Sequence, residues 1–226
     1  MSPPLGSPRV HHRRTGSTNE RARELALLEA PHGTLVTADE QTAGRGRQGR
    51  SWTAPPRSAV LMSLVLRDFE EVLPLAAAVA ICQSLPVEGA IKWPNDVWVE
   101  GRKLAGILVE GRPQAGWAVL GIGLNVTTGS FPDELAQTAT SLRLAGVETD
   151  VETVLADVVG ALTTWLALPI DAVLSAWRER DALRGQRVRW KDGEGIASGI
   201  DDSGALLVET AGGPVALGAG EVHLLR

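Results

Sequence analysis

Residues 90–126 read AIKWPNDVWVEGRKLAGILVEGRPQAGWAVLGIGLNV and contain four short apolar runs. The runs cover residues 90–93, 97–99, 104–109 and 117–126, and each gap between them holds proline, asparagine or glycine. Apolar runs of this length bounded by turn residues are typical of β-strands joined by tight turns. The stretch therefore predicts consecutive antiparallel strands.

Helical and strand-like patterns are mixed on both sides of this stretch. Upstream, the sequence predicts a helix over 21–28, strands over 34–37 and 59–66, and a helix over 71–85. Downstream, the spacing of Thr149 and Glu152 is that of a capping box, and it predicts a helix over 151–168 followed by another over 171–183. The larger part of the chain is therefore expected to be an α+β domain.

The pattern of apolar residues and turn residues changes after Gly185. Short β-like runs cover residues 187–190, 195–200, 206–209, 215–217 and 222–225, with glycine-containing turns between them. We expect three parts: an N-terminal tail over 1–16, a main domain over 17–184 and a small β domain over 185–226.

Composition limits the classes of protein. The chain of 226 residues has 44% hydrophobic and 22% charged residues, which are ordinary globular values. It contains no apolar run near the roughly 20 residues that span a bilayer, and its start lacks a signal-peptide core. We therefore expect a cytoplasmic protein with no membrane partner. Cys82 is the single cysteine, which excludes an internal disulfide, and its apolar neighbours predict core packing.

A cationic, glycine-rich segment stands out in a chain whose net charge is −5. Residues 44–52, the Gly/Arg loop, read GRGRQGRSW, and no Asp or Glu occurs from Gln41 to Arg67. Glycines let backbone N–H groups converge on an anion, and arginines add charge-assisted bonds to carboxylate or phosphate. The segment also matches dinucleotide-fingerprint and P-loop spacings, but Pro55-Pro56 excludes the helix that both motifs require. It predicts either an anion-binding loop or a solvated flexible one.

Two further segments carry polar residues at strand ends. Lys103 opens an apolar run in which Gly106 allows a ligand close to the backbone, and Lys92, Asn95 and Asp96 lie just upstream. In the other segment, Gly121 and Gly123 expose the backbone of a strand before Asn125, and the Asn125 amide can pair with a polar ring edge.

Together these segments resemble the catalytic domain of the biotin protein ligases. The resemblance rests on six ordered motifs: Ser17-Thr-Asn19, Gln41-Thr-Ala-Gly-Arg-Gly-Arg47, Lys92-Trp-Pro-Asn-Asp96, Arg102-Lys-Leu-Ala-Gly-Ile-Leu108, Gly121-Ile-Gly-Leu-Asn125, and Phe131-Pro132 with Ala139-Thr-Ser-Leu142. It implies a class II aminoacyl-tRNA synthetase/biotin protein ligase-like mixed sheet with helices, followed by a small SH3-like β barrel. It also implies two reactions. Biotin and ATP give biotinyl-5′-adenylate, usually with Mg²⁺, and a lysine of a biotin carboxyl carrier domain then displaces AMP.

The resemblance and the residue chemistry define one predicted site. Catalysis is assigned to Lys103, Arg47 and Asp96. Lys103 and Arg47 are chosen because joining a carboxylate to a phosphate requires fixed cations. Asp96 has two open roles, positioning Mg²⁺ or deprotonating the acceptor lysine. The residues expected to contact biotin or the adenylate are Ser17, Thr18, Asn19, Gln41, Gly44, Arg45, Gly46, Arg47, Arg50, Trp52, Lys92, Asn95, Lys103, Gly106 and Asn125.

Two other functions remain open at this point. A lipoate ligase would share the fold and the adenylation chemistry, although the 45–47 and Lys103 segments favour biotin. A non-catalytic nucleic-acid-binding module would use the Gly/Arg loop alone, but aromatic residues make up only 4% of an acidic chain. Only sixteen residues precede Ser17, so we expect no DNA-reading domain and no DNA partner. The oligomeric state is open, with a homodimer among the options.

Overall fold

The computed structural model describes residues 4–67, 69, 72–112, 114, 116–218 and 220–225. Its larger sheet has seven strands in the order β1-β2-β3-β7-β6-β5-β4. β1 pairs with β2 in parallel and every other neighbouring pair is antiparallel, which confirms the pairing predicted for residues 90–126. The strands are β1 (Arg9–His12), β2 (Leu35–Ala38), β3 (Ala59–Leu66), β4 (Ala90–Lys92), β5 (Asp96–Val99), β6 (Arg102–Arg112) and β7 (Trp117–Asn125).

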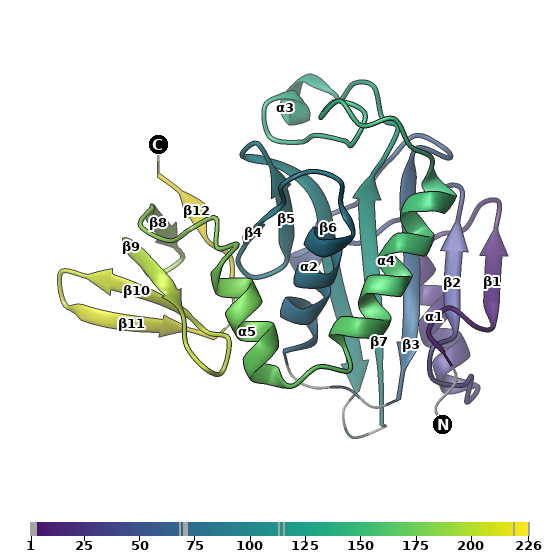
Figure 1. The fold of residues 1–226 in the computed structure, drawn as a ribbon, viewed down its shortest axis with the longest axis horizontal. Coiled ribbons are helices and arrows are strands. Elements are labelled where there is room, and N and C mark those ends of the chain that lie inside the picture. The colour runs from purple at the N-terminus through teal and green to yellow at the C-terminus, as the bar shows by residue number, and fades with distance from the viewer. Residues whose placement is uncertain are drawn as a thin grey trace.

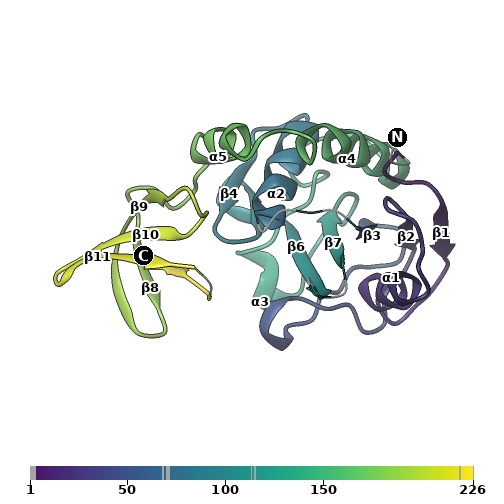
Figure 2. The same cartoon turned by 90° about the horizontal axis from the view of Figure 1, so that it is seen from below.

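Helices cover both faces of this sheet. α2 (Leu73–Ser84), α4 (Val151–Trp165) and α5 (Ile170–Arg178) lie on one face, and α1 (Thr18–Leu27) lies on the other (Figures 1 and 2). β3 is buried along its whole length because it is central and covered on both sides. This explains why seven of its eight residues are apolar, since a strand with one face in water would alternate apolar and polar residues.

Helix α2 forms the centre of the core. It is apolar around its circumference because it packs against both the sheet and α4. Cys82 lies within it, and burial raises the pKa of its thiol to about 12. This location confirms the predicted packing role of Cys82. The predicted helix start at Glu71 lies outside the described residues.

The predicted ends of two helices were wrong. α4 is capped by Asp150 rather than Thr149, and the Asp150 side chain accepts hydrogen bonds from the backbone N–H groups of Glu152 at 2.9 Å and Thr153 at 3.0 Å. α5 ends at Arg178 rather than near residue 183, because the following backbone pairs with the free edge of β4. There the Ile91 N–H donates to the Arg180 carbonyl at 2.7 Å.

The expected N-terminal tail contains strand β1. Its four residues extend the sheet beyond β2, and Arg9 forms two hydrogen bonds of 2.6 and 2.7 Å with the Glu152 carboxylate at the start of α4. The sequence carries little sign of this strand, because Arg9–His12 holds a single apolar residue, Val10. The pairing of β1 with β2 therefore comes from tertiary contacts rather than from an apolar pattern.

The C-terminal residues form a second, five-stranded antiparallel sheet in the order β11-β10-β9-β8-β12. Its strands are β8 (Arg187–Trp190), β9 (Gly193–Ile200), β10 (Leu206–Thr210), β11 (Gly213–Leu217) and β12 (His223–Leu224).

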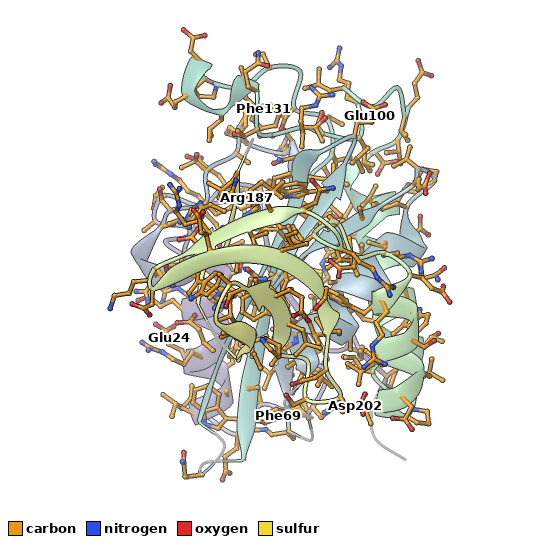
Figure 3. The ribbon with its side chains drawn as sticks, turned by 90° about the vertical axis from the view of Figure 1, so that its left-hand side faces the viewer. Glu24, Phe69, Glu100, Phe131, Arg187 and Asp202 are labelled. Carbon is orange, nitrogen blue, oxygen red and sulfur yellow. The ribbon has the colours of Figure 1, made fainter. Side chains whose placement is uncertain are left out.

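The small sheet packs beside β4 and α5 (Figure 1). Trp93 Nε1 donates to the Gly204 carbonyl at 3.0 Å, and Arg178 pairs with Asp202 at 2.8 Å. Figure 3 looks onto the curved strands of this sheet, with Arg187 and Asp202 at different ends of it. α3 (Asp133–Ala136) is a short turn of helix in the loop after β7. No helix in the described part of the chain is both long and apolar enough to cross a membrane.

Candidate active site

A polar cavity lies where the Gly/Arg loop crosses strands β6 and β7. The start of α1, the end of β4 and residues 220–221 of the C-terminal part complete its walls. Its volume is about 100 Å³, which is below the 300–1,000 Å³ usual for small-molecule sites. In this conformation the Gly/Arg loop and its side chains leave only this small space open.

The side chain of Trp52 takes up part of this space. Its indole ring lies flat against Gly123 of β7, and a Cβ added to Gly106 of β6 would be only 3.2 Å from the ring. Lys103 Nζ lies 5.6 Å from the ring centroid, within the range of a cation–π contact. The two glycines thus make a flat platform on which the loop rests.

Each arginine of the Gly/Arg loop contacts a protein acceptor. Arg45 lies 3.7 Å from the Glu20 carboxylate of α1, and Arg50 pairs with the Glu221 carboxylate. Arg47 donates to Asn95 Oδ1 and to the Gly220 carbonyl, both at 3.3 Å. Burial is the main cause that lowers the pKa of Arg47. The protein therefore holds this cation in a partly dehydrated position where an anion would interact strongly.

Two lysines add to the positive charge. Lys103 Nζ pairs with Asp96 Oδ1 at 2.8 Å, and the Lys103 backbone is fixed by hydrogen bonds to Thr138 and Thr140. Burial lowers the pKa of Lys92, the nearby Asp96 carboxylate opposes that shift, and Lys103 adds to it. Lys92, Lys103 and Arg47 therefore share the single Asp96 carboxylate, and this excess of positive charge favours binding of a further anion.

The floor of the cavity is a hydrogen-bonded polar network. Gln41 Oε1 accepts from the Thr18 backbone N–H at 2.7 Å, so the first turn of α1 is capped from outside the helix. Asn19 lies on Gly121 of β7, at a distance that leaves no room for a Cβ there. Ser63 Oγ is 2.9 Å from Thr18 Oγ1 and 2.6 Å from Asn19 Oδ1. These residues can present fixed donors and acceptors to a polar ligand.

Most residues of the predicted site line this one cavity. They are Ser17, Thr18, Asn19, Gln41, Arg45, Gly46, Arg47, Arg50, Trp52, Lys92, Asn95, Asp96, Lys103 and Gly106. The α1 helix begins at Thr18 rather than at residue 21 as predicted, which places Thr18 and Asn19 in its first turn.

Two residues of the predicted site lie elsewhere. Asn125 is buried, and its Nδ2 donates to the Thr140 carbonyl at 3.0 Å, so its amide fixes the loop after β7 and does not line the cavity. Gly44 lies against the Trp52 backbone, where a Cβ would clash, and its carbonyl accepts from the Trp52 N–H at 2.9 Å. Its role in the structure is to close the loop.

Several residues at the site carry no motif in the sequence. Gly220 and Glu221 come from the expected C-terminal domain, in which the motifs placed no site residue. Ser63 joins the floor network from inside the strand predicted over 59–66, and Glu110 joins it from the position just after the run predicted over 104–109. A polar residue on an otherwise apolar run, such as Ser63 in residues 59–66, is the signal that could have identified them.

Family models match both parts of the chain. The model of the Biotin/lipoate A/B protein ligase family matches residues 12–126, and the model of the Biotin protein ligase C terminal domain matches residues 184–225.

Individual relatives match over most of their length. The bifunctional ligase/repressor BirA of Bacillus subtilis is 36% identical over 97% of this chain and 75% of its own. The biotin–[acetyl-CoA-carboxylase] ligase of Mycobacterium tuberculosis is 37% identical over 94% of this chain and 87% of its own.

A solved structure of a biotin protein ligase from Aquifex aeolicus with biotin and ATP superposes with a TM-score of 0.85, at 26% identity, over 97% of this chain and 99% of that one. The expected fold class and the resemblance inferred from the motifs are thereby confirmed. The chain belongs to the biotin/lipoate A/B protein ligase family.

Proposed function

We propose that this chain activates biotin with ATP and transfers the biotinyl group to a lysine of a biotin carboxyl carrier domain. The observation that carries the proposal is the convergence of Lys92, Lys103 and Arg47 on a cavity with a polar floor. The Mycobacterium tuberculosis relative is named for ligation of biotin to acetyl-CoA carboxylase, and the Aquifex aeolicus structure holds biotin and ATP.

Adenylation needs cations at the point where negative charge gathers. A biotin carboxylate oxygen attacks the α-phosphorus, a P–O bond forms, and the P–O bond to pyrophosphate breaks. Lys103 and Arg47 stabilise the charge that spreads over the phosphate oxygens. Lys92, held in a partly dehydrated position, adds a third cation. The closeness of all three to the cavity supports this assignment.

Transfer needs a neutral acceptor amine. The lysine nitrogen attacks the biotinyl carbon, an amide bond forms, and AMP leaves with the electrons of the broken C–O bond. The mixed anhydride is already activated, so no enzyme nucleophile is needed. The Asp96 carboxylate, whose Oδ1 pairs with Lys103, can accept the proton that the amine loses.

The carboxylates at the cavity also fit a magnesium ion. Mg²⁺ is held in nucleotide sites by one or two carboxylates together with phosphate oxygens and water. Asp96 and Glu221 both line the cavity and could serve as those ligands. The ion would neutralise phosphate charge when bound.

The polar floor favours biotin over lipoate. A ureido ring offers two N–H donors and a carbonyl, whereas a dithiolane ring has no comparable groups. A dithiolane would form no hydrogen bonds with Thr18, Asn19 or Gln41, whereas a ureido ring can exchange its hydrogen bonds to water for bonds to these side chains. We therefore propose Thr18 and Gln41 as contacts of the ureido ring. A homodimer and the absence of a DNA partner stay predictions.

The direct test is transfer to a purified carrier domain. The protein is incubated with the domain, ATP, Mg²⁺ and either biotin or lipoate, and the product is weighed by intact-protein mass spectrometry. The expected result is a biotinyl adduct on one lysine that requires ATP. An adduct formed with lipoate alone would support the alternative function, and absence of any adduct would contradict the proposal.

A further inference from the structure

A chain of hydrogen bonds runs from the rim of the cavity to its floor. Glu110 of β6 accepts from Asn19 Nδ2 at 2.8 Å, and Asn19 Oδ1 lies 2.6 Å from Ser63 Oγ. Ser63 Oγ lies 2.9 Å from Thr18 Oγ1, which is 3.0 Å from Gln41 Oε1. Thr18 and Gln41 line the cavity, whereas Glu110 lies outside it, at a second opening beneath the Gly/Arg loop.

The carboxylate at the outer end, together with the Leu108 carbonyl 3.5 Å from Asn19 Nδ2, sets the direction of the Asn19 and Ser63 protons in this chain. A carboxylate only accepts hydrogen bonds, so the Asn19 amide must turn its NH₂ toward Glu110 and its carbonyl toward Ser63. The Ser63 hydroxyl then donates to that carbonyl, and its oxygen is left as an acceptor. Gly121 beneath the Asn19 amide keeps the amide plane against β7.

The consequence appears at Thr18. Its one hydroxyl proton has two inward acceptors, Ser63 Oγ at 2.9 Å and Gln41 Oε1 at 3.0 Å. With either partner the proton points into the protein, and both lone pairs of the Thr18 oxygen stay free. If the Asn19 amide were reversed, Ser63 would donate to Thr18 and occupy one of those lone pairs. The ligand would then meet a poorer acceptor.

We propose that Glu110 is a positioning residue that fixes the proton direction of this chain and makes the Thr18 hydroxyl oxygen a full acceptor for a ligand N–H group. The proposal rests on the proposed function, in which that ligand is the ureido ring of biotin. Glu110 acts through Asn19 and Ser63 and touches neither substrate. Its effect falls on recognition of biotin rather than on ATP or on the chemical step.

The test is the Glu110→Gln variant, which keeps the shape but can offer either an acceptor or a donor to Asn19. Biotin Kd is measured by titration calorimetry, and ATP KM and kcat are measured at saturating biotin. The expected result is a biotin Kd raised about three- to tenfold, the range for weakening one hydrogen bond, with ATP KM and kcat within about twofold of the parent. Glu134→Gln, an exposed charge change on α3, is the matched control and should leave biotin Kd unchanged.

A double variant separates proton direction from general structural damage. In Asn19→Asp with Glu110→Gln, the carboxylate introduced at position 19 accepts from both the side-chain amide introduced at position 110 and the Ser63 hydroxyl, which restores the original direction. Biotin Kd should return at least halfway to the parent value. A merely structural role for Glu110 predicts no such recovery, because the double variant is the more heavily altered protein.

A double-mutant cycle between Ser63 and Glu110 keeps the test decisive if the Asn19→Asp/Glu110→Gln variant does not fold. Ser63→Ala cuts the chain, so adding Glu110→Gln to it should change biotin Kd by less than about twofold from Ser63→Ala alone. A parent-like Kd in Glu110→Gln, or full additivity with Ser63→Ala, would overturn the inference. Failure of the parent protein to biotinylate the carrier domain would instead contradict the proposed function, and the two failures are therefore distinguishable.

Discussion

The indole ring of Trp52 lies directly on Gly123, which joins the Gly/Arg loop to the middle of the central sheet. The contact is close enough that any Cβ at position 123 would overlap the ring. Strand β7 therefore carries a glycine at this point because an aromatic side chain covers its backbone. Lys103 Nζ also lies over this ring, 5.6 Å from its centroid.

Gly123→Ala is expected to displace Trp52 while leaving the sheet intact. The methyl group adds no backbone strain in an extended strand, but it pushes the indole off its platform. We expect ATP affinity, measured by calorimetry with biotin present, to fall at least tenfold because the loop can no longer close in register. The matched control is Gly129→Ala, whose added Cβ would meet open space. An ATP affinity that is unchanged in Gly123→Ala would show that ATP binding does not depend on the position of Trp52.

Lys103→Ala is expected to lower adenylate formation about a hundredfold or more, the usual cost of losing one fixed charge at a developing anion. Pyrophosphate release measures this step. Loss of the Asp96 partner is a second effect of the substitution, so Lys103→Ala is compared with Lys103→Ala/Asp96→Asn, which removes the stranded carboxylate. Lys191→Ala, an exposed lysine, is the control. If Lys103→Ala releases pyrophosphate at nearly the parent rate, Lys103 is not a catalytic residue.

ATP binding should weaken as pH rises through the alkaline range. Burial lowers the pKa of Lys92 below its usual 10.5, so the free protein loses this positive charge at a lower pH than an exposed lysine would. A bound phosphate favours the charged form and raises the pKa again. In the window between the two pKa values, ATP binding must therefore take up protons.

Calorimetry in two buffers of different ionisation enthalpy measures this uptake. The expected uptake is close to zero at neutral pH and grows as pH approaches the lowered pKa. Lys92→Met should abolish the growth with pH, because no titrating lysine remains. Equal uptake in the parent and in Lys92→Met would assign the effect to another group.

The sequence predicted those parts of the fold that have local signals. Strand β3 was predicted with its observed bounds because seven of its eight residues are apolar and Pro55-Pro56 lie just before it. Strand β1 was missed because its stability comes from pairing with β2 and from the Arg9–Glu152 ion pair, which are contacts between distant residues. The early end of α5 has the same origin, since its last predicted residues pair with β4 instead.

The site was predicted where one motif carried several polar residues. The Gly/Arg loop and the segment around Lys103 did converge on one cavity. Asn125 does not line this cavity, because an asparagine after a strand serves equally well to hold a loop, and here its amide donates to the Thr140 carbonyl. Glu221 was missed because its partner Arg50 lies far away in the sequence, and only the folded chain brings them together.

The Gly/Arg loop should close over ligand and protect the adenylate. In the structure its arginines pair with Glu20, Glu221 and Asn95, but Arg45 and Arg50 are about half exposed, and ion pairs of that kind contribute little. A bound carboxylate or phosphate would replace them with stronger charge-assisted bonds. Ordering a glycine-rich loop costs entropy that such bonds can offset. A closed loop would also exclude water from the mixed anhydride.

Limited trypsin digestion tests whether the Gly/Arg loop becomes ordered when ligand binds. Cleavage after Arg45, Arg47 or Arg50 should be fast in the free protein and strongly suppressed by biotin with ATP, while cleavage after the exposed Lys191 should not change. Arg47→Ala removes the contacts to Asn95 and Gly220 that tie the loop to both halves of the molecule. It should therefore weaken ligand binding and raise the rate at which adenylate escapes into solution. If the loop is cut equally fast in both states, with ligand occupancy verified in the same sample, the loop does not close, and the adenylate must be protected by the fixed walls of the cavity alone.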